Sequence, residues 1–302
     1  MCLILLAYRC HPDVDVLLAG NRDEFLRRAA APPGLVHSAP RIWAGRDLEA
    51  GGTWMGRNEH GLLAALTNRR SAAPPPPEAR SRGELVLGLL RQPTPESAAR
   101  WLAGQPHGRF RPYSVLFGDT RAFHYFSPQD SAPPRRLEPG AYALSNAALD
   151  DASWPKVERS QRFLRERLGR PGAELLAELQ RFLCDPTPAD AQASGEPGEE
   201  IHGAMGAVFI RGDGAGARSG KDTAQGGSTS AAGNSALGGD GTAHGGDPAL
   251  GGYGTVSSSI FTRGGRLGDG YWYAERAAMI RAAQDADAGQ PFRSPFRPIP
   301  LE

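Results

Sequence analysis

The chain begins with two apolar runs separated by a short polar segment, a pattern typical of a buried β-hairpin. The runs cover residues 2–8 and 16–20, and residues 9–15 form the predicted turn. Neither run alternates with polar residues. Such runs predict strands buried on both faces, as in a sheet covered by helices.

The rest of the chain alternates between hairpins and helices. Two prolines at 32–33 and the next dozen residues predict a loop. Apolar runs predict strands at 62–67, 113–117, 123–126, 142–146, 204–210 and 255–262. Amphipathic spacing or capping signals predict helices at 83–91, 95–102, 156–168, 173–182 and 273–283. Paired strands with helices between them favour an α+β layered fold over an all-parallel wound sheet.

One segment lacks the composition of a packed structure. Residues 212–252 are 41 residues long and contain 14 glycines and no aromatic side chain. Such a segment cannot bury enough apolar surface to offset the entropy lost on ordering. We expect a single domain over residues 1–302 that carries a disordered Gly-rich insertion at 212–252.

Composition excludes several classes of protein. The formal net charge is +1, which disfavours nucleic-acid binding. The apolar run at 2–8 is too short to span a membrane and lacks the charged flank of a signal peptide. Three cysteines make a disulfide framework unlikely and favour a reducing, cytoplasmic location.

Cys2 is the first candidate for chemistry. Its small side chain permits removal of Met1, which would leave a free α-amino group beside the Cys2 thiol. One residue would then supply both a nucleophile and a general base. The alternative interpretation is that Cys2 is an ordinary buried residue of a first strand.

A polar quartet at 21–24 follows the second strand. Because antiparallel strands pair outward from the turn, with Tyr8 near Val16, Cys2 should lie close to Arg22. A carboxylate there, such as Asp23, would hold an ammonium, and a guanidinium would lower a thiol pKa. The alternative is a solvated strand end with a surface ion pair.

Two asparagines, Asn68 and Asn146, each end a predicted strand. An amide fixed by a sheet is a suitable oxyanion donor, although asparagine is also a common strand-ending residue. The seven histidines show no metal-ligand spacing, and no phosphate-loop or dinucleotide fingerprint occurs. We therefore expect neither a metal nor a cofactor.

Several segments together resemble the NRDE family, the homologues of transport and Golgi organisation protein 2. The shared segments are Met1-Cys2-Leu3-Ile4, Asn21-Arg22-Asp23-Glu24-Phe25, Ala44-Gly45-Arg46-Asp47, Gly51-Gly52-Thr53-Trp54-Met55-Gly56, Ala65-Leu66-Thr67-Asn68, Leu144-Ser145-Asn146, Trp154-Pro155-Lys156-Val157 and Tyr253-Gly254-Thr255 before Ser257-Ser258. They span nearly the whole chain in the family's order.

This family in turn resembles the N-terminal-nucleophile hydrolases of the cysteine type, which include penicillin V acylase and bile-salt hydrolase. The resemblance implies a four-layer αββα sandwich with Cys2 at the start of a central strand. By it, Asp23 would hold the freed amine, Arg22 would lie by the thiol, and Asn68 and Asn146 would fall near the oxyanion site. One departure is Val256, which stands where the family commonly has arginine.

Three functions remain open. The first is an amidohydrolase that acts on a linear, non-peptide C–N bond in a small-molecule amide or lipid-like substrate. The second is a non-catalytic lipid- or haem-handling protein that uses the same pocket. The third is a degenerate hydrolase retained for its fold, because a fold does not establish an activity. The oligomeric state is open as well.

We predict that Met1 is absent from the mature protein made in a bacterial cell, because the nucleophile mechanism requires a free amine on Cys2. Intact-mass analysis of the purified protein measures this directly. A mass that retains Met1 in full would remove the base and contradict the mechanism.

Overall fold

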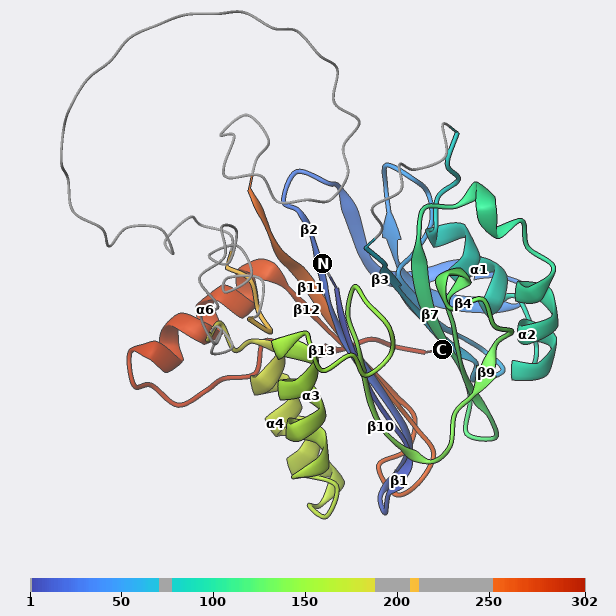
Figure 1. Ribbon diagram of the computed structural model, residues 1–302. Helices are drawn as coiled ribbons and strands as arrows, with labels where there is room; N and C mark the ends of the chain where they lie inside the picture. The colour runs from blue at the N-terminus through green and yellow to red at the C-terminus, as the bar shows by residue number, and fades with distance from the viewer. Residues whose placement is uncertain (1, 71–77, 188–206, 212–251, 302) are drawn as a thin grey trace, which may run out of the picture.

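Two antiparallel β-sheets that pack against each other form the centre of the molecule (Figure 1). The structure is a computed structural model that describes residues 2–70, 78–187, 207–211 and 252–301. The first sheet has the order β10(Gly140–Leu144), β1(Leu3–His11), β2(Val14–Phe25), β11(Tyr253–Arg263), β12(Gly270–Glu275), β13(Arg297–Pro298). The second has the order β3(Ala30–Ser38), β4(Arg41–Asp47), β5(Met55–Asn58), β6(Leu63–Asn68), β7(Tyr113–Gly118), β8(Phe123–Phe126), β9(Arg135–Arg136).

Helices cover the outer face of each sheet, as Figure 1 shows. The second sheet is covered by α1(Gly83–Leu90) and α2(Pro95–Ala103), whose leucines pack on β6 and β7. The first is covered by α3(Pro155–Arg165), α4(Gly172–Leu183) and α6(Arg276–Asp287). The layer order is helix, sheet, sheet, helix. This confirms the predicted α+β fold with four layers in the order αββα.

The pleat of β1 and β2 determines which side chains enter which layer. Even-numbered residues such as Ile4 and Leu18 pack between the two sheets. Odd-numbered residues such as Leu5 and Leu17 pack under the helices. Both faces are therefore apolar, because successive strand residues point to opposite sides and both sides are covered.

The predicted N-terminal hairpin is confirmed, with Tyr8 opposite Val16. The predicted loop after residues 32–33 is wrong, because these residues lie in β3, the edge strand of the second sheet. The register between β3 and β4 shifts between Ala31 and Gly34, and the two prolines occupy that irregularity. Proline lacks an N–H and is tolerated in a sheet at edges and bulges.

Two predictions near the C-terminus need correction. The predicted helix at 273–283 begins at Arg276, because Tyr273 and its neighbours form β12. Of the predicted strand at 204–210, residues 204–206 lie outside the described residues and residues 207–210 belong to no strand, since 207–209 form bends; β11 instead pairs with β2 and β12. The predicted disordered insertion lies outside the described residues, except for Gly252. Among the described helices, none is both long and apolar enough to cross a membrane.

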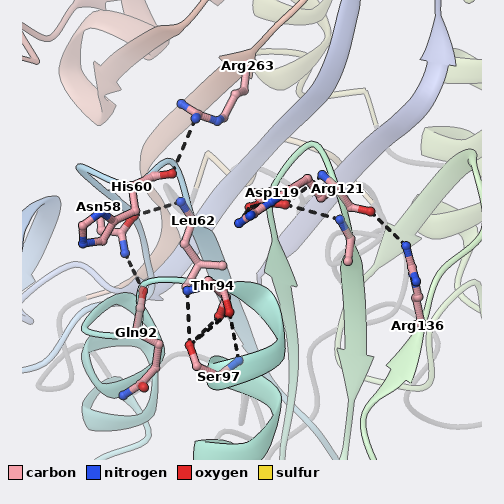
Figure 2. Close-up of polar contacts among 11 residues, drawn as sticks. Asn58, His60, Leu62, Gln92, Thr94, Ser97, Asp119, Arg121, Arg136 and Arg263 are labelled. Atoms are coloured by element: carbon pink, nitrogen blue, oxygen red, sulfur yellow. Dashed lines mark hydrogen bonds and ion pairs between the residues drawn. The ribbon is translucent and has the colours of Figure 1, made fainter.

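Polar contacts attach α1 to the second sheet, and Figure 2 shows them at the loop after β5. The amide nitrogen of Asn58, a fully buried residue, donates to the carbonyls of Leu90 and Gln92, both at 2.8 Å. Its amide oxygen accepts from the N–H of Leu62 at 2.9 Å. One side chain thus satisfies two carbonyls at the C-terminal end of a helix and one donor of a tight turn.

We expect Asn58→Ala to lower the free energy of unfolding by about 2–4 kcal/mol, because it leaves three buried backbone groups without a partner. Gln92→Ala is the matched control, since its side chain makes one longer bond, 3.3 Å, to the carbonyl of Gly88. Urea denaturation compares the two variants. Equal, small losses would show that the Asn58 contacts contribute little.

Candidate functional site

A cavity of about 390 Å³ lies where the ends of the two sheets meet the start of α1. Cys2, next to the first residue of β1, lines it together with Arg22 of β2 and Asn68 at the end of β6. Three of the residues singled out from the sequence therefore share one cavity. The first two lie on the even-numbered, inter-sheet side of the first sheet.

Cys2 is half-buried, and its carbonyl accepts a hydrogen bond from the Ser145 hydroxyl at 2.9 Å. Burial is the largest effect on the Cys2 thiol and raises its pKa above the ordinary value. The terminal ammonium, the next largest effect, lowers the pKa; the carboxylate of Asp23 raises it, and a backbone hydrogen bond from Asp23 lowers it by less. The thiol is therefore protonated at neutral pH, and a reaction at Cys2 requires a nearby base.

Arg22 is held by two contacts on the cavity wall. Its guanidinium lies 3.3 Å from the carboxylate of Asp47 and 4.5 Å from the ring centre of Trp54. Asp47 also accepts from Arg28 at 2.8 Å and from the N–H of Ala50. Burial alone would raise the pKa of Asp47, but these bonds lower it. The Gly45-Arg46-Asp47 segment thus supplies the carboxylate that orients Arg22.

Asp23 lies on the opposite face of β2, under α3. Its carboxylate is 3.4 Å from the ammonium of Lys156 and accepts from the Thr255 hydroxyl at 2.7 Å. Both charged side chains are fully buried, with 0% exposure. Lys156 lies in one of the segments that resemble the family, but the sequence alone indicates no role for it. The available signal was its rarity, because the chain contains only two lysines among 34 basic residues.

Ser145 and Asn146 form hydrogen bonds that connect the two sheets beside the cavity. The amide nitrogen of Asn146 donates to the carbonyl of Asn68 at 2.7 Å, while Ser145 holds the carbonyl of Cys2. Asn146 follows the end of β10, and its carbonyl accepts from the N–H of Arg70 at 2.9 Å. The turn after β10 therefore sets the spacing between Cys2 on one sheet and Asn68 on the other.

Arg82, directly before α1, also lines the cavity, and the sequence alone did not identify it. Its guanidinium donates to the carbonyl of Pro112 at 3.0 Å. Burial, then the like charge of Arg111, lower the pKa of Arg82 to about 10, and interaction with Cys2 acts against that decrease. No sequence signal marked it, because Arg82 belongs to no motif and does not end a predicted strand.

Val256 lies next to the site, at an irregularity in the sheet. The register of β11 on β2 shifts between Thr255, opposite Asp23, and Ser257, opposite Arg22. Val256 is the extra residue of this β-bulge. In the described part of the chain, no three His, Cys, Asp or Glu side chains lie together as a metal site would require.

Sequence comparison relates the chain to a protein family along most of its length. A family model described as Transport and Golgi organisation 2 matches residues 1–267. The Transport and Golgi organization protein 2 homolog of Homo sapiens is 28% identical over 240 residues, which cover 72% of this chain and 86% of the human protein. The Bos taurus homolog is 30% identical over 202 residues, 61% of this chain and 72% of the bovine protein.

Two solved structures are similar to the chain at low identity. Penicillin V acylase from Agrobacterium tumefaciens has a TM-score of 0.37 and 11% identity, and covers 91% of this chain and 83% of its own. A mutant of the conjugated bile acid hydrolase from Clostridium perfringens has a TM-score of 0.42 and 12% identity, with coverages of 91% and 89%. Neither score is high enough to transfer a property of the site.

We expect Lys156→Met to lower the free energy of unfolding by about 3–5 kcal/mol, because it leaves the buried carboxylate of Asp23 without its cation. Combining it with Asp23→Asn should restore much of that loss, since the uncompensated charge is then gone. Arg162→Met, which removes an exposed cation from the same helix, should change stability by less than about 0.5 kcal/mol. Urea denaturation of these three variants and of Asp23→Asn alone measures the coupling, and additive losses would contradict it.

Proposed function

The chain belongs to the Transport and Golgi organisation 2 family, and from this premise we propose that it is a cysteine N-terminal-nucleophile amidohydrolase. The proposed substrate is a small-molecule or lipid-like amide with a linear, non-peptide C–N bond. Cys2 is the proposed nucleophile after removal of Met1. The observation that carries the proposal is that Cys2 and Asn68 line one cavity, with the carboxylate of Asp23 on the neighbouring strand.

The first half of the reaction forms a thioester. The free α-amino group of Cys2 takes the thiol proton while sulfur attacks the carbonyl carbon of the amide. Asn68 is the proposed donor to the oxyanion, since no hydrogen bond of its side-chain amide to another described residue competes. When the tetrahedral intermediate collapses, the C–N bond breaks and the α-ammonium gives its proton to the leaving amine.

The second half regenerates the enzyme. Water attacks the thioester carbonyl while the α-amine takes a proton from it, and the carboxylic acid leaves as the thiol reforms. The raised thiol pKa supports a mechanism of this kind, because a protonated thiol needs a base within the same residue to react.

The remaining residues position these groups. Asp23, paired with Lys156 and Thr255, is the proposed partner of the freed amine. Arg22 is proposed to act on the inter-sheet side, near the thiol, where Asp47 and Trp54 hold it. Asn146 holds the backbone of Asn68 and so orients the oxyanion donor.

The raised pKa of Cys2 also favours a second candidate, a non-catalytic protein that binds a lipid-like ligand or haem in the same cavity. A thiol that stays protonated and unreactive after Met1 removal would fit that function. Reactivity of Cys2 therefore distinguishes the two candidates.

We predict that Cys2 of the processed protein is alkylated faster near pH 7.5 than Cys10 and Cys184. Burial raises the pKa of Cys10, and that of Cys184 to about 12 with a contribution from Asp185, and neither residue has its own amine. Peptide mapping after brief iodoacetamide treatment measures the three rates. Labelling confined to Cys10 or Cys184 would favour the binding protein.

The matched control retains Met1 through a leucine inserted between Met1 and Cys2, since methionine removal requires a small second residue. Because burial raises the thiol pKa, labelling of this control should increase only at more alkaline pH than labelling of the processed protein. Identical pH profiles for the two proteins would show that the α-amine does not act as the base. In hydrolysis assays with an amide panel, Asn68→Ala should lower kcat by about 100-fold.

A further inference from the structure

The cavity in front of Cys2 is lined by more cations than anions. Five arginines and two carboxylates face it among the described residues, although the whole chain is almost neutral. Such a concentration of one charge around a proposed nucleophile repels itself unless something neutralises it.

Most of these arginines have a carboxylate partner. Arg22 and Arg28 share Asp47, and Arg28 also lies 3.9 Å from Glu24, the second carboxylate of the wall. Arg80 is paired at 2.5 Å with Glu84, one turn further along the chain. Each of these cations is oriented by the protein itself and needs no ligand to compensate its charge.

Arg82 differs from them. Its hydrogen bond goes to the carbonyl of Pro112, and within the described part of the chain no carboxylate forms an ion pair with it. Arg111 lines the same cavity, and its like charge acts on Arg82. An anion that enters the cavity would therefore be attracted by Arg82 and could accept from its guanidinium.

We propose that Arg82 binds an oxyanion of the substrate, a carboxylate or a phosphate, so that the enzyme selects amides that carry this group next to the scissile bond. The inference rests on the proposed function and names its substrate class. A guanidinium matches either oxyanion through two parallel N–H bonds. Arg82 is thus a specificity-determining residue.

The position of Arg82 limits the size of the substrate. Arg82 and Cys2 line the same cavity of about 390 Å³, so the anion and the attacked carbonyl must both fit within it. An N-acyl amino acid, whose carboxylate lies two bonds from the amide nitrogen, satisfies this requirement. A substrate whose charged group lies at the far end of a long chain does not.

A competing role for Arg82 is stabilisation of the Cys2 thiolate alone. The two roles differ in what remains when the thiol is absent. Anion binding by Arg82 persists in a Cys2→Ala protein, whereas thiolate stabilisation has no effect there. The binding experiment therefore uses the full chain with Cys2→Ala.

Calorimetric titration at constant ionic strength measures three probes: inorganic phosphate, N-acetylglycine and the neutral N-acetylglycinamide. We expect at least one of the two anions to bind ten times more tightly than the neutral probe, and Arg82→Gln to abolish that preference. Whichever anion is preferred identifies the substrate group. Arg91→Gln is the matched control, because it removes an exposed cation from the other end of α1 and should change nothing.

Two results overturn the inference: equal binding of all three probes, or an anion preference that survives Arg82→Gln. If Arg82→Gln does not fold, Arg82→Lys keeps the charge and loses the two-bond geometry. It should weaken anion binding at least threefold, and unchanged binding would overturn the inference as well.

A second measurement separates this inference from the proposed function. With Cys2 intact, N-acyl amino acids should exceed their neutral amides at least tenfold in kcat/KM, and Arg82→Gln should remove the difference through KM. If no amide is cleaved while the anion preference depends on Arg82, the hydrolase proposal fails and the anion site stands. If amides are cleaved without charge preference, the hydrolase stands and the anion inference fails.

Discussion

The antiparallel register of β1 and β2 is the constraint on which the candidate site depends. Leu3 pairs with Asn21, so Cys2 emerges beside Arg22 and Asp23 at the same end of the sheet. Because successive side chains of a strand point to opposite faces, the Arg22 side chain lies in the inter-sheet cavity and the Asp23 side chain lies under the helices. A shift of one residue would exchange the two faces and bury the wrong charge in each layer.

The buried pair of Asp23 and Lys156 shows what this arrangement requires from the rest of the fold. Two fully buried charges lose their hydration, and their mutual attraction offsets that loss only when further hydrogen bonds complete the geometry. The Thr255 hydroxyl supplies one such bond from β11. Two strands and a helix from distant parts of the chain therefore converge on a single carboxylate next to the proposed nucleophile.

Two opposing electrostatic effects act on negative charge in the cavity. Burial disfavours the thiolate of Cys2, while the surrounding arginines favour any anion that enters. Arg22 is neutralised by Asp47, and Arg82 has no such carboxylate among the described residues. The first arrangement is complete in the folded protein, and the second would be completed by the anion that we propose Arg82 to bind.

The sequence by itself determined the layered fold, the N-terminal hairpin and the family, because these follow from local apolar patterns and from short motifs. It also identified Cys2, Arg22 and Asn68, since strand ends and hairpin register can be read along the chain. The edge strand β3 was missed because its prolines indicate a loop unless a bulge accommodates them. Tyr273 was assigned to a helix because β12 and α6 are contiguous and no breaker separates them.

Only the tertiary structure decided the partners of these residues. Lys156 lies in α3 and Arg82 directly precedes α1, and these helices pack on opposite outer faces of the sandwich; no local pattern records which buried group each residue will meet. The cause is physical: an ion pair or a cavity wall depends on contacts between residues far apart in the chain, whereas strand and helix signals depend on neighbours. The sequence therefore supplied the proposed nucleophile, and the packing of the layers supplied its electrostatic surroundings.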